Sequence, residues 1–103
     1  MLDTRGSGQE YSRMELSKLE KISDLYTNDK RCIYAELLRG CDGGIVCFRE
    51  WLTNHGGGDS YNFCVINSMV ELKEELKKDV DHGDLAAGMV DKICKEIAAK
   101  GIF

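Results

Sequence analysis

Residues 39–64 read RGCDGGIVCFREWLTNHGGGDSYNFC and bring together three of the five cysteines, one of the two histidines and the one tryptophan of the chain. Glycine clusters at 43–44 and 56–58 interrupt this stretch. Two interpretations compete. The thiols and the imidazole could build a metal or catalytic site, or the glycines could be joints between helices with the cysteines as small apolar side chains between them.

The spacing of the ligand types argues against a metal. Cys41, Cys47, His55 and Cys64 are residues that zinc binds, and four of them would close a tetrahedral site. Structural zinc sites draw their ligands from close pairs with about two to four residues between them. Here five, seven and eight residues separate successive candidates. We therefore expect neither a metal nor another cofactor, and these four residues stay the candidate ligands if one binds.

A cysteine nucleophile is not expected either. A reactive thiolate needs a positively charged neighbour or a helix N-terminus to stabilise it. Cys41 is followed directly by Asp42, whose negative charge disfavours the thiolate. We therefore assign no catalytic residue and expect no enzyme activity.

Outward from this stretch, apolar residues recur at helical spacing. Between residues 10 and 26 the side chains of Tyr11, Leu19, Ile22 and Leu25 fall on one face of a helix. Similar stripes, with caps and glycine stops, predict further helices at 30–40, 45–58, 60–80 and 85–101. The chain also lacks proline, the residue that helices tolerate least. The sequence therefore predicts an all-α fold, a compact bundle of about five helices.

One alternative is an α+β fold. Residues 44–48 and 61–66 are rich in β-branched and aromatic residues and are bounded by turn formers, so they could pair as a small two-stranded sheet. In either case residues 1–8 show no period and are predicted to be a flexible N-terminal arm. Residues 9–103 form a single domain of ordinary size.

The charge and the hydropathy of the chain argue against some classes of function. With 14 basic and 18 acidic residues the net charge is −4, which weakens attraction to nucleic acid. The predicted helices at 30–40 and 45–58 resemble a helix-turn-helix in outline, but the second offers Arg49 alone as a basic residue. A DNA-binding regulator and a small zinc-binding domain therefore remain alternatives.

No apolar run approaches the ~20 residues that cross a bilayer, so no membrane contact is expected. The odd number of cysteines and the lack of a secretory leader predict a cytoplasmic protein.

The remaining hypothesis is a non-catalytic protein–protein interaction module: an adaptor, a regulator or an inhibitor of another protein. Aromatic residues are common anchors at protein interfaces, and several flank the glycine clusters. Acidic residues at 71–75 would select a partner with a basic surface, and a homodimer is also possible. The predicted partner-binding residues are Phe48, Trp51, Tyr61, Glu71, Glu74, Glu75, Ile102 and Phe103.

Overall fold

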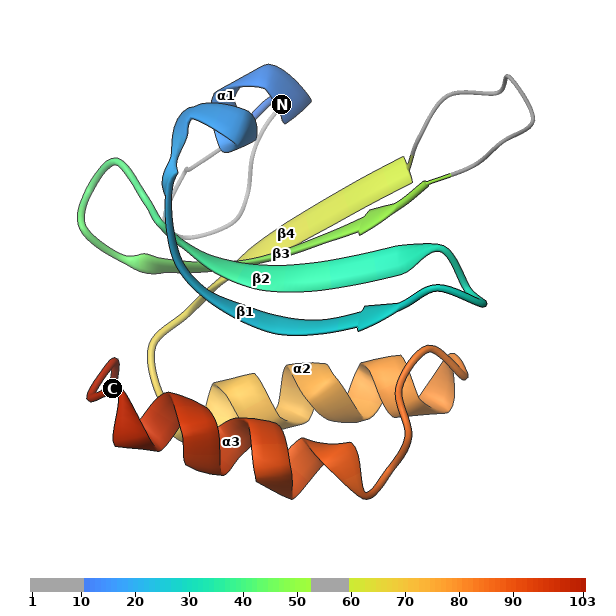
Figure 1. Ribbon diagram of the computed structural model, residues 1–103. Helices are drawn as coiled ribbons and strands as arrows, with labels where there is room; N and C mark the ends of the chain where they lie inside the picture. The colour runs from blue at the N-terminus through green and yellow to red at the C-terminus, as the bar shows by residue number, and fades with distance from the viewer. Residues whose placement is uncertain (1–10, 53–59) are drawn as a thin grey trace.

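The structure, a computed structural model, describes residues 11–52 and 60–103. It is an α+β fold in which a four-stranded antiparallel sheet lies between one short helix and a pair of longer ones (Figure 1). The elements in chain order are α1 (Arg13–Lys18), β1 (Glu20–Asn28), β2 (Ile33–Arg39), β3 (Ile45–Trp51), β4 (Ser60–Ile66), α2 (Met69–Asp81) and α3 (Met89–Ala99).

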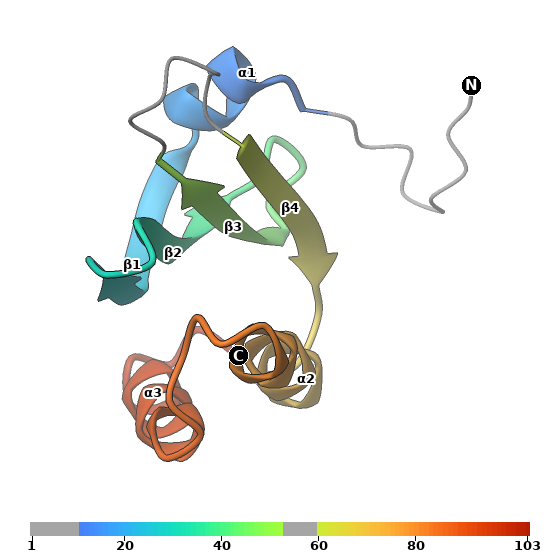
Figure 2. The ribbon, with the colours of Figure 1, turned by 90° about the vertical axis from the view of Figure 1, so that its right-hand side faces the viewer.

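The described part of the chain forms three layers. The strands follow one another in space in the order of the sequence, β1-β2-β3-β4, so β1 and β4 are the edge strands. Helices α2 and α3 lie side by side under one face of the sheet, with α2 on the β4 side and α3 on the β1 side, and α1 lies over the opposite face (Figure 2). We call these the helix face and the α1 face of the sheet.

The two edges of the sheet differ in regularity. The β2–β3 and β3–β4 ladders run without a break from end to end. The β1–β2 ladder shifts register between Lys21 and Ser23 and again between Asp24 and Tyr26. Such irregularities bend and twist an edge strand. In the turn between β2 and β3, Gly43 has a φ of 90°, a conformation in which glycine has no steric penalty.

The larger core lies between the sheet and the C-terminal helices. Strands β2, β3 and β4 contribute alternate residues to it, β1 contributes the consecutive Leu25 and Tyr26 at its second register shift, and the helices contribute stripes at helical spacing. In α2 the Ser68 side chain caps the N-terminus by accepting a hydrogen bond from the Glu71 amide. The most enclosed members of this core are Leu37, Cys47, Leu72, Leu76, Ile93 and Ile97.

A smaller core covers the α1 face. Helix α1 begins with a capping box between Ser12 and Glu15, which fixes its short span, and it buries Leu16 against the sheet. Leu16 packs with Leu38 and Phe48 from the central strands, and Tyr11 closes the cluster. As a result, β3 is buried on both faces: six of its seven residues are buried, and Trp51 is half-buried.

The prediction of an all-α bundle of five helices is wrong. The range 10–26 contains α1 and β1, and 30–40 is β2. The range 45–58 contains β3, with its remainder partly outside the described residues, and 60–80 contains β4 followed by α2. The segment predicted to resemble a helix-turn-helix consequently contains the β-hairpin of β2 and β3. Among the described residues, the long helices are α2 and α3, within the segments predicted at 60–80 and 85–101.

The physical reason is burial on both faces. A strand covered on both sides has a continuous apolar run, so its periodicity does not distinguish it from a buried helix. In β2, Ile33 and Leu37 face α2 and α3 while Leu38 faces α1. If the segment is instead taken as a helix, the same three residues fall on one side of it, which is why the sequence predicted a helix here. The two-stranded alternative at 44–48 and 61–66 falls within β3 and β4 but omits β1 and β2.

We predict that Leu72→Ala lowers the free energy of unfolding by about 2–5 kcal/mol, because Leu72 is fully buried beneath the sheet and its loss leaves a cavity. The matched control is Val70→Ala on the same helix, since Val70 is 66% exposed and should change stability by less than about 0.5 kcal/mol. Urea unfolding followed by circular dichroism measures both. Equal losses in the two variants would contradict the packing of α2 on the sheet.

Candidate functional site

Two consecutive charged residues, Arg49 and Glu50, lie near the end of β3 and point to opposite faces of the sheet. Arg49 is 4% exposed and Glu50 is 3% exposed. A buried charge without a partner costs several kcal/mol, about 3–5 when a pair is broken. Each of the two therefore requires partners from the layer that covers it.

On the helix face the charged partners of Arg49 come from α2, and its Nη1 also donates to Asn62 Oδ1 on β4 at 3.3 Å. Its Nε lies 2.6 Å from Asp79 Oδ1, an ion pair in which the N–H is not aligned for a hydrogen bond. Its Nη2 donates to the main-chain oxygen of Glu75 at 2.9 Å and to Glu75 Oε1 at 3.1 Å. The Tyr26 hydroxyl on β1 donates to Asp79 Oδ2 at 2.6 Å. We call Tyr26, Arg49, Glu75 and Asp79 the Arg49 cluster.

Within this cluster, which braces β3 against α2, Tyr26 and Arg49 have strongly shifted pKa values. Burial and the hydrogen bond to Asp79 raise the pKa of Tyr26 far above its ordinary value. Burial alone would lower the pKa of Arg49, but Cys47 and Asp79 outweigh it and raise the pKa. Both groups therefore keep their protons at neutral pH, and neither can serve as a general base.

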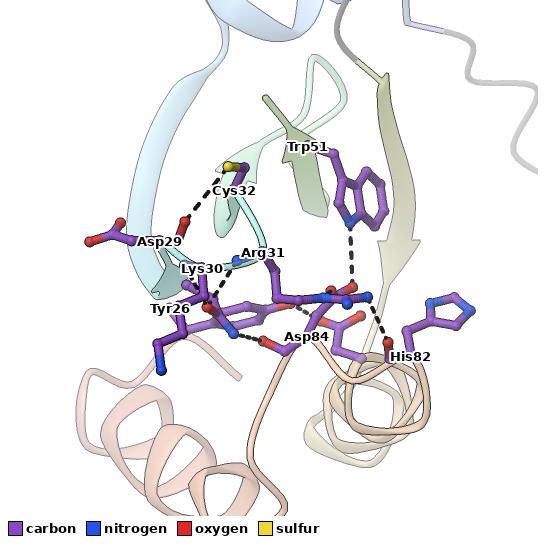
Figure 3. A network of polar contacts seen from close by, with 10 residues as sticks. Tyr26, Asp29, Lys30, Arg31, Cys32, Trp51, His82 and Asp84 are labelled. Carbon is purple, nitrogen blue, oxygen red and sulfur yellow. Dashed lines mark hydrogen bonds and ion pairs between the residues drawn. The ribbon is translucent and has the colours of Figure 1, made fainter. Parts of the chain in front are cut away.

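A second polar network closes the same end of the helix face (Figure 3). Asp84, in the connection between α2 and α3, is 2% exposed. Its Oδ1 accepts from Arg31 Nε at 3.0 Å and its Oδ2 from Trp51 Nε1 at 3.3 Å, while its main-chain oxygen accepts from Asn28 Nδ2 at 2.8 Å. This carboxylate thus ties the β1–β2 turn and the end of β3 to the helical layer.

On the α1 face, Glu50 is held by Arg13 and Tyr34. Arg13 Nε and Nη2 donate to the two carboxylate oxygens at 2.7 Å each, and the Tyr34 hydroxyl donates to Oε1 at 2.6 Å. The Arg13 guanidinium also lies 5.4 Å from the centre of the Phe48 ring. The hydrogen bonds from Arg13 hold the pKa of Glu50 below its ordinary value, against the opposing effect of burial. The pair fixes α1 to the sheet.

The structure separates the metal candidates in part. Cys47 and Cys64 lie directly opposite each other on β3 and β4. Cys41 is exposed in the β2–β3 turn, and its amide donates to the Tyr11 hydroxyl, which lies on the other face of the sheet from Cys47. His55 lies outside the described residues. Within residues 11–52 and 60–103 no three groups of suitable type gather where they could hold a metal ion.

The predicted partner-binding aromatics do not form one patch. Phe48 is buried under α1, whereas Trp51 is half-buried on the helix face. Tyr61 is 37% exposed on β4, and its ring lies 6.4 Å from that of Phe48. Ile102 packs against the larger core, and Phe103 beside it is 39% exposed.

The predicted acidic residues lie along α2, but two of them have local structural roles. Glu71 Oε1 accepts a hydrogen bond from the Asn67 amide at 2.7 Å. Glu75 is shared between Arg49 and Lys78, whose Nζ lies 2.9 Å from Oε2. Glu74 is exposed. The sequence analysis did not identify Asp79 and Asp84 as buried residues, because in the sequence they look like ordinary surface residues. The adjacent charges at 49–50 inside an apolar run were the available signal that buried charges need partners.

The outer edge of β4 is the surface that the rest of the described fold leaves open. Its seven residues, SYNFCVI, include no charge, no proline and no glycine, and its pairing with β3 has no bulge. By contrast, the other edge strand, β1, carries Glu20, Lys21 and Asp24 and has two register shifts. Charges and bulges are the usual protection of an edge strand against pairing with another chain. In the described part of the chain, no further backbone segment bonds to the outer edge of β4.

The two rows of side chains on β4 offer different surroundings. Tyr61, Phe63 and Val65 lie on the α1 face beside Phe48 and Val46, and they form an apolar row. Asn62 and Cys64 lie on the helix face, at the mouth of a cavity of about 220 Å³. The cavity is lined from α2 and the α2–α3 connection by Glu75, Lys78, Asp79 and His82. A segment that paired with β4 would meet an apolar row on one side and charged groups on the other.

Comparison of the chain with protein-family models, with curated proteins and with solved structures gives no match. None of the helices in the described ranges combines the length and the apolar character that crossing a bilayer requires. The case for a function therefore rests on the edge of β4 and on the two buried charges that hold β3.

We predict that Asp79→Asn lowers the free energy of unfolding by about 3 kcal/mol, because it leaves the buried Arg49 with Glu75 as its remaining carboxylate partner. Asp81→Asn is the matched control, since Asp81 is exposed near the same end of α2 and should cost less than about 0.5 kcal/mol. Urea unfolding measures both variants. A loss below about 0.5 kcal/mol for Asp79→Asn, the scatter seen for exposed sites, would show that the brace is not essential.

A second prediction concerns acid stability. Because the pKa of Glu50 is lowered in the folded state, its ionised form stabilises the fold above the unfolded pKa of about 4.3, and this contribution is lost as the pH falls through the folded pKa. Glu50→Gln should therefore cost about 1–3 kcal/mol near neutral pH and progressively less below about pH 4. Unfolding curves across that range, with Glu20→Gln as the exposed control, measure the effect. The same cost at every pH would rule out the ionised pair as its source.

Proposed function

We propose that the protein is a non-catalytic interaction module that binds an extended segment of another protein by strand addition along β4. The observation that carries this proposal is the contrast between its two edge strands, one bulged and charged and the other straight and uncharged. An uncovered edge presents a row of backbone donors and acceptors, which gives affinity for an extended chain. Adaptors, regulators and inhibitors all use this mode of binding.

The side chains next to the edge define the partner. Residues paired directly across antiparallel strands have Cβ atoms about 4.5–5.5 Å apart. Alternate side chains of the partner would therefore contact Tyr61, Phe63 and Val65, and these should be apolar. The intervening side chains would lie beside Asn62 and Cys64, at the mouth of the cavity. Glu75 and Asp79 in the cavity are already paired with Arg49 and Lys78, but helix α2 as a whole carries five acidic and three basic residues, so we expect a lysine or arginine in this row.

A second copy of the chain is a weaker fit to the same edge. Pairing of β4 with β4 would present Asn62 and Cys64 to the cavity, and neither carries a positive charge that could form an ion pair with the acidic residues of α2. The apolar stripes of α2 and α3 are buried under the sheet and therefore offer no dimer surface. The odd number of cysteines fits a reducing compartment, so we propose the cytoplasm as the location.

The test is a selection from a random peptide library displayed on phage, followed by affinity measurements on the enriched peptides. We expect peptides with apolar residues at alternate positions and a basic residue between them. Tyr61→Lys, which places a charge on the exposed edge, should weaken their Kd about tenfold or more. The matched control is Thr27→Lys, an exposed position on the α1 face of the other edge strand, which should leave the Kd unchanged.

Three results would contradict the proposal: no enrichment of alternating peptides, equal weakening by the two lysine variants, or a dimer in light scattering that Tyr61→Lys dissociates. The last result would assign the edge to a second copy of the chain instead of a partner. Because Tyr61 is 37% exposed, the variant should keep its fold, and circular dichroism checks that it does.

A further inference from the structure

Two of the five cysteines lie next to each other in the sheet, and the proposed function gives this pair no role. Cys47 on β3 and Cys64 on β4 are directly opposite in the antiparallel register. Both belong to the helix face, where Cys64 packs against the core that contains Cys47. The other three cysteines lie in separate places: Cys32 in the β1–β2 turn, Cys41 in the β2–β3 turn and Cys94 on α3.

We propose that Cys47 and Cys64 form a redox-active pair that hydrogen peroxide, or another small hydroperoxide, converts into an intramolecular disulfide across the β3–β4 ladder. The backbone geometry permits it. Directly opposite residues in an antiparallel pair have Cα atoms about 4.5–5.5 Å apart, and disulfides join Cα atoms about 4.4–6.8 Å apart. No strand has to move for the bond to form.

The position of Cys64 gives a small oxidant access to the pair. Cys47 is fully buried, whereas Cys64 is half-buried and lines the cavity of about 220 Å³ beside β4. Hydrogen peroxide has two heavy atoms, about the size of two water molecules, and fits this cavity. A larger oxidant such as oxidised glutathione is too big to enter it. The structure thus places Cys64 as the residue that meets the oxidant and Cys47 as the residue that resolves it.

The electrostatic surroundings support proton exchange within the pair. The hydrogen bond between the two sulfurs lowers the pKa of Cys47, with Arg49 also favouring its thiolate, although burial opposes both. The same hydrogen bond and burial raise the pKa of Cys64. The proton shared by the two sulfurs therefore resides on Cys64, and Cys64, the sulfur that the oxidant can reach, becomes the nucleophile when this proton moves to Cys47.

The chemistry balances as follows. Cys64 Sγ passes its proton to Cys47 Sγ and attacks one oxygen of the peroxide; the O–O bond breaks, and the departing hydroxide takes that proton to become water. The Cys47 thiolate then attacks the sulfenic sulfur of Cys64, the S–O bond breaks and the second hydroxide leaves as water after protonation. One thiol, one thiolate, one proton from solvent and one hydrogen peroxide give one disulfide and two waters, so sulfur is oxidised and the peroxide oxygen is reduced.

The test treats the reduced, folded protein with equimolar hydrogen peroxide and then alkylates the remaining thiols after denaturation. We expect the number of alkylated thiols to fall from five to three, with no covalent dimer, and to return to five after reduction with dithiothreitol. Because Cys41 and Cys47 share one tryptic peptide, residues 40–49, a Cys41→Ser variant identifies the bridge to Cys64 unambiguously by mass spectrometry.

Two single variants test the order of the steps. In Cys47→Ser the Cys64 sulfenic acid has no resolving partner, so dimedone should label Cys64. In Cys64→Ser the buried Cys47 should stay reduced. Loss of thiols at Cys32 or Cys41 while Cys47 and Cys64 stay reduced would overturn the proposal, as would a bridge between two chains. Neither result depends on whether β4 binds a peptide, so the two proposals fail separately.

Discussion

The burial of Arg49 and Glu50 on opposite faces of one strand is the constraint on which the rest of the structure depends. Each charge must be matched by a layer of its own. Helix α2 brings Asp79 and Glu75 to Arg49, and α1 brings Arg13 to Glu50. Replacing such pairs by apolar residues often costs nothing in stability, so their value lies in fixing which element covers which face. Here they specify the order and the positions of the layers.

With both faces of the sheet covered in the described part of the chain, its two edges are the parts of the sheet that could still pair with another chain. Strand β1 is closed to pairing by its charges and its two register shifts, whereas β4 has neither. The cavity beside β4 opens between that edge and α2, and the thiol of Cys64 lies in its wall. Peptide binding and peroxide oxidation would therefore involve the same corner of the molecule, although each rests on its own observations.

Part of the fold and of the candidate site can be predicted from the sequence, and part cannot. The helices at 69–81 and 89–99 are predictable because one side of each is apolar and the other charged. Strands β2 and β3 are not, because burial on both faces removes the alternation that identifies a strand, and Ile33, Leu37 and Leu38 then fit a helical stripe. The roles of Asp79 and Asp84 also depend on long-range contacts, with Tyr26 and with Arg31, that no local pattern records.

The central claim for function is that the outer edge of β4 is open. Hydrogen exchange of the backbone amides in β4, resolved by NMR, tests this claim most directly. In an open edge strand every second amide bonds to the neighbouring strand and the others face solvent. We expect protected and unprotected amides to alternate along residues 60–66, beside continuous protection along the central part of β3. Uninterrupted protection through residues 60–66 would contradict the account, because it would mean that this segment is helical or that its edge is already covered.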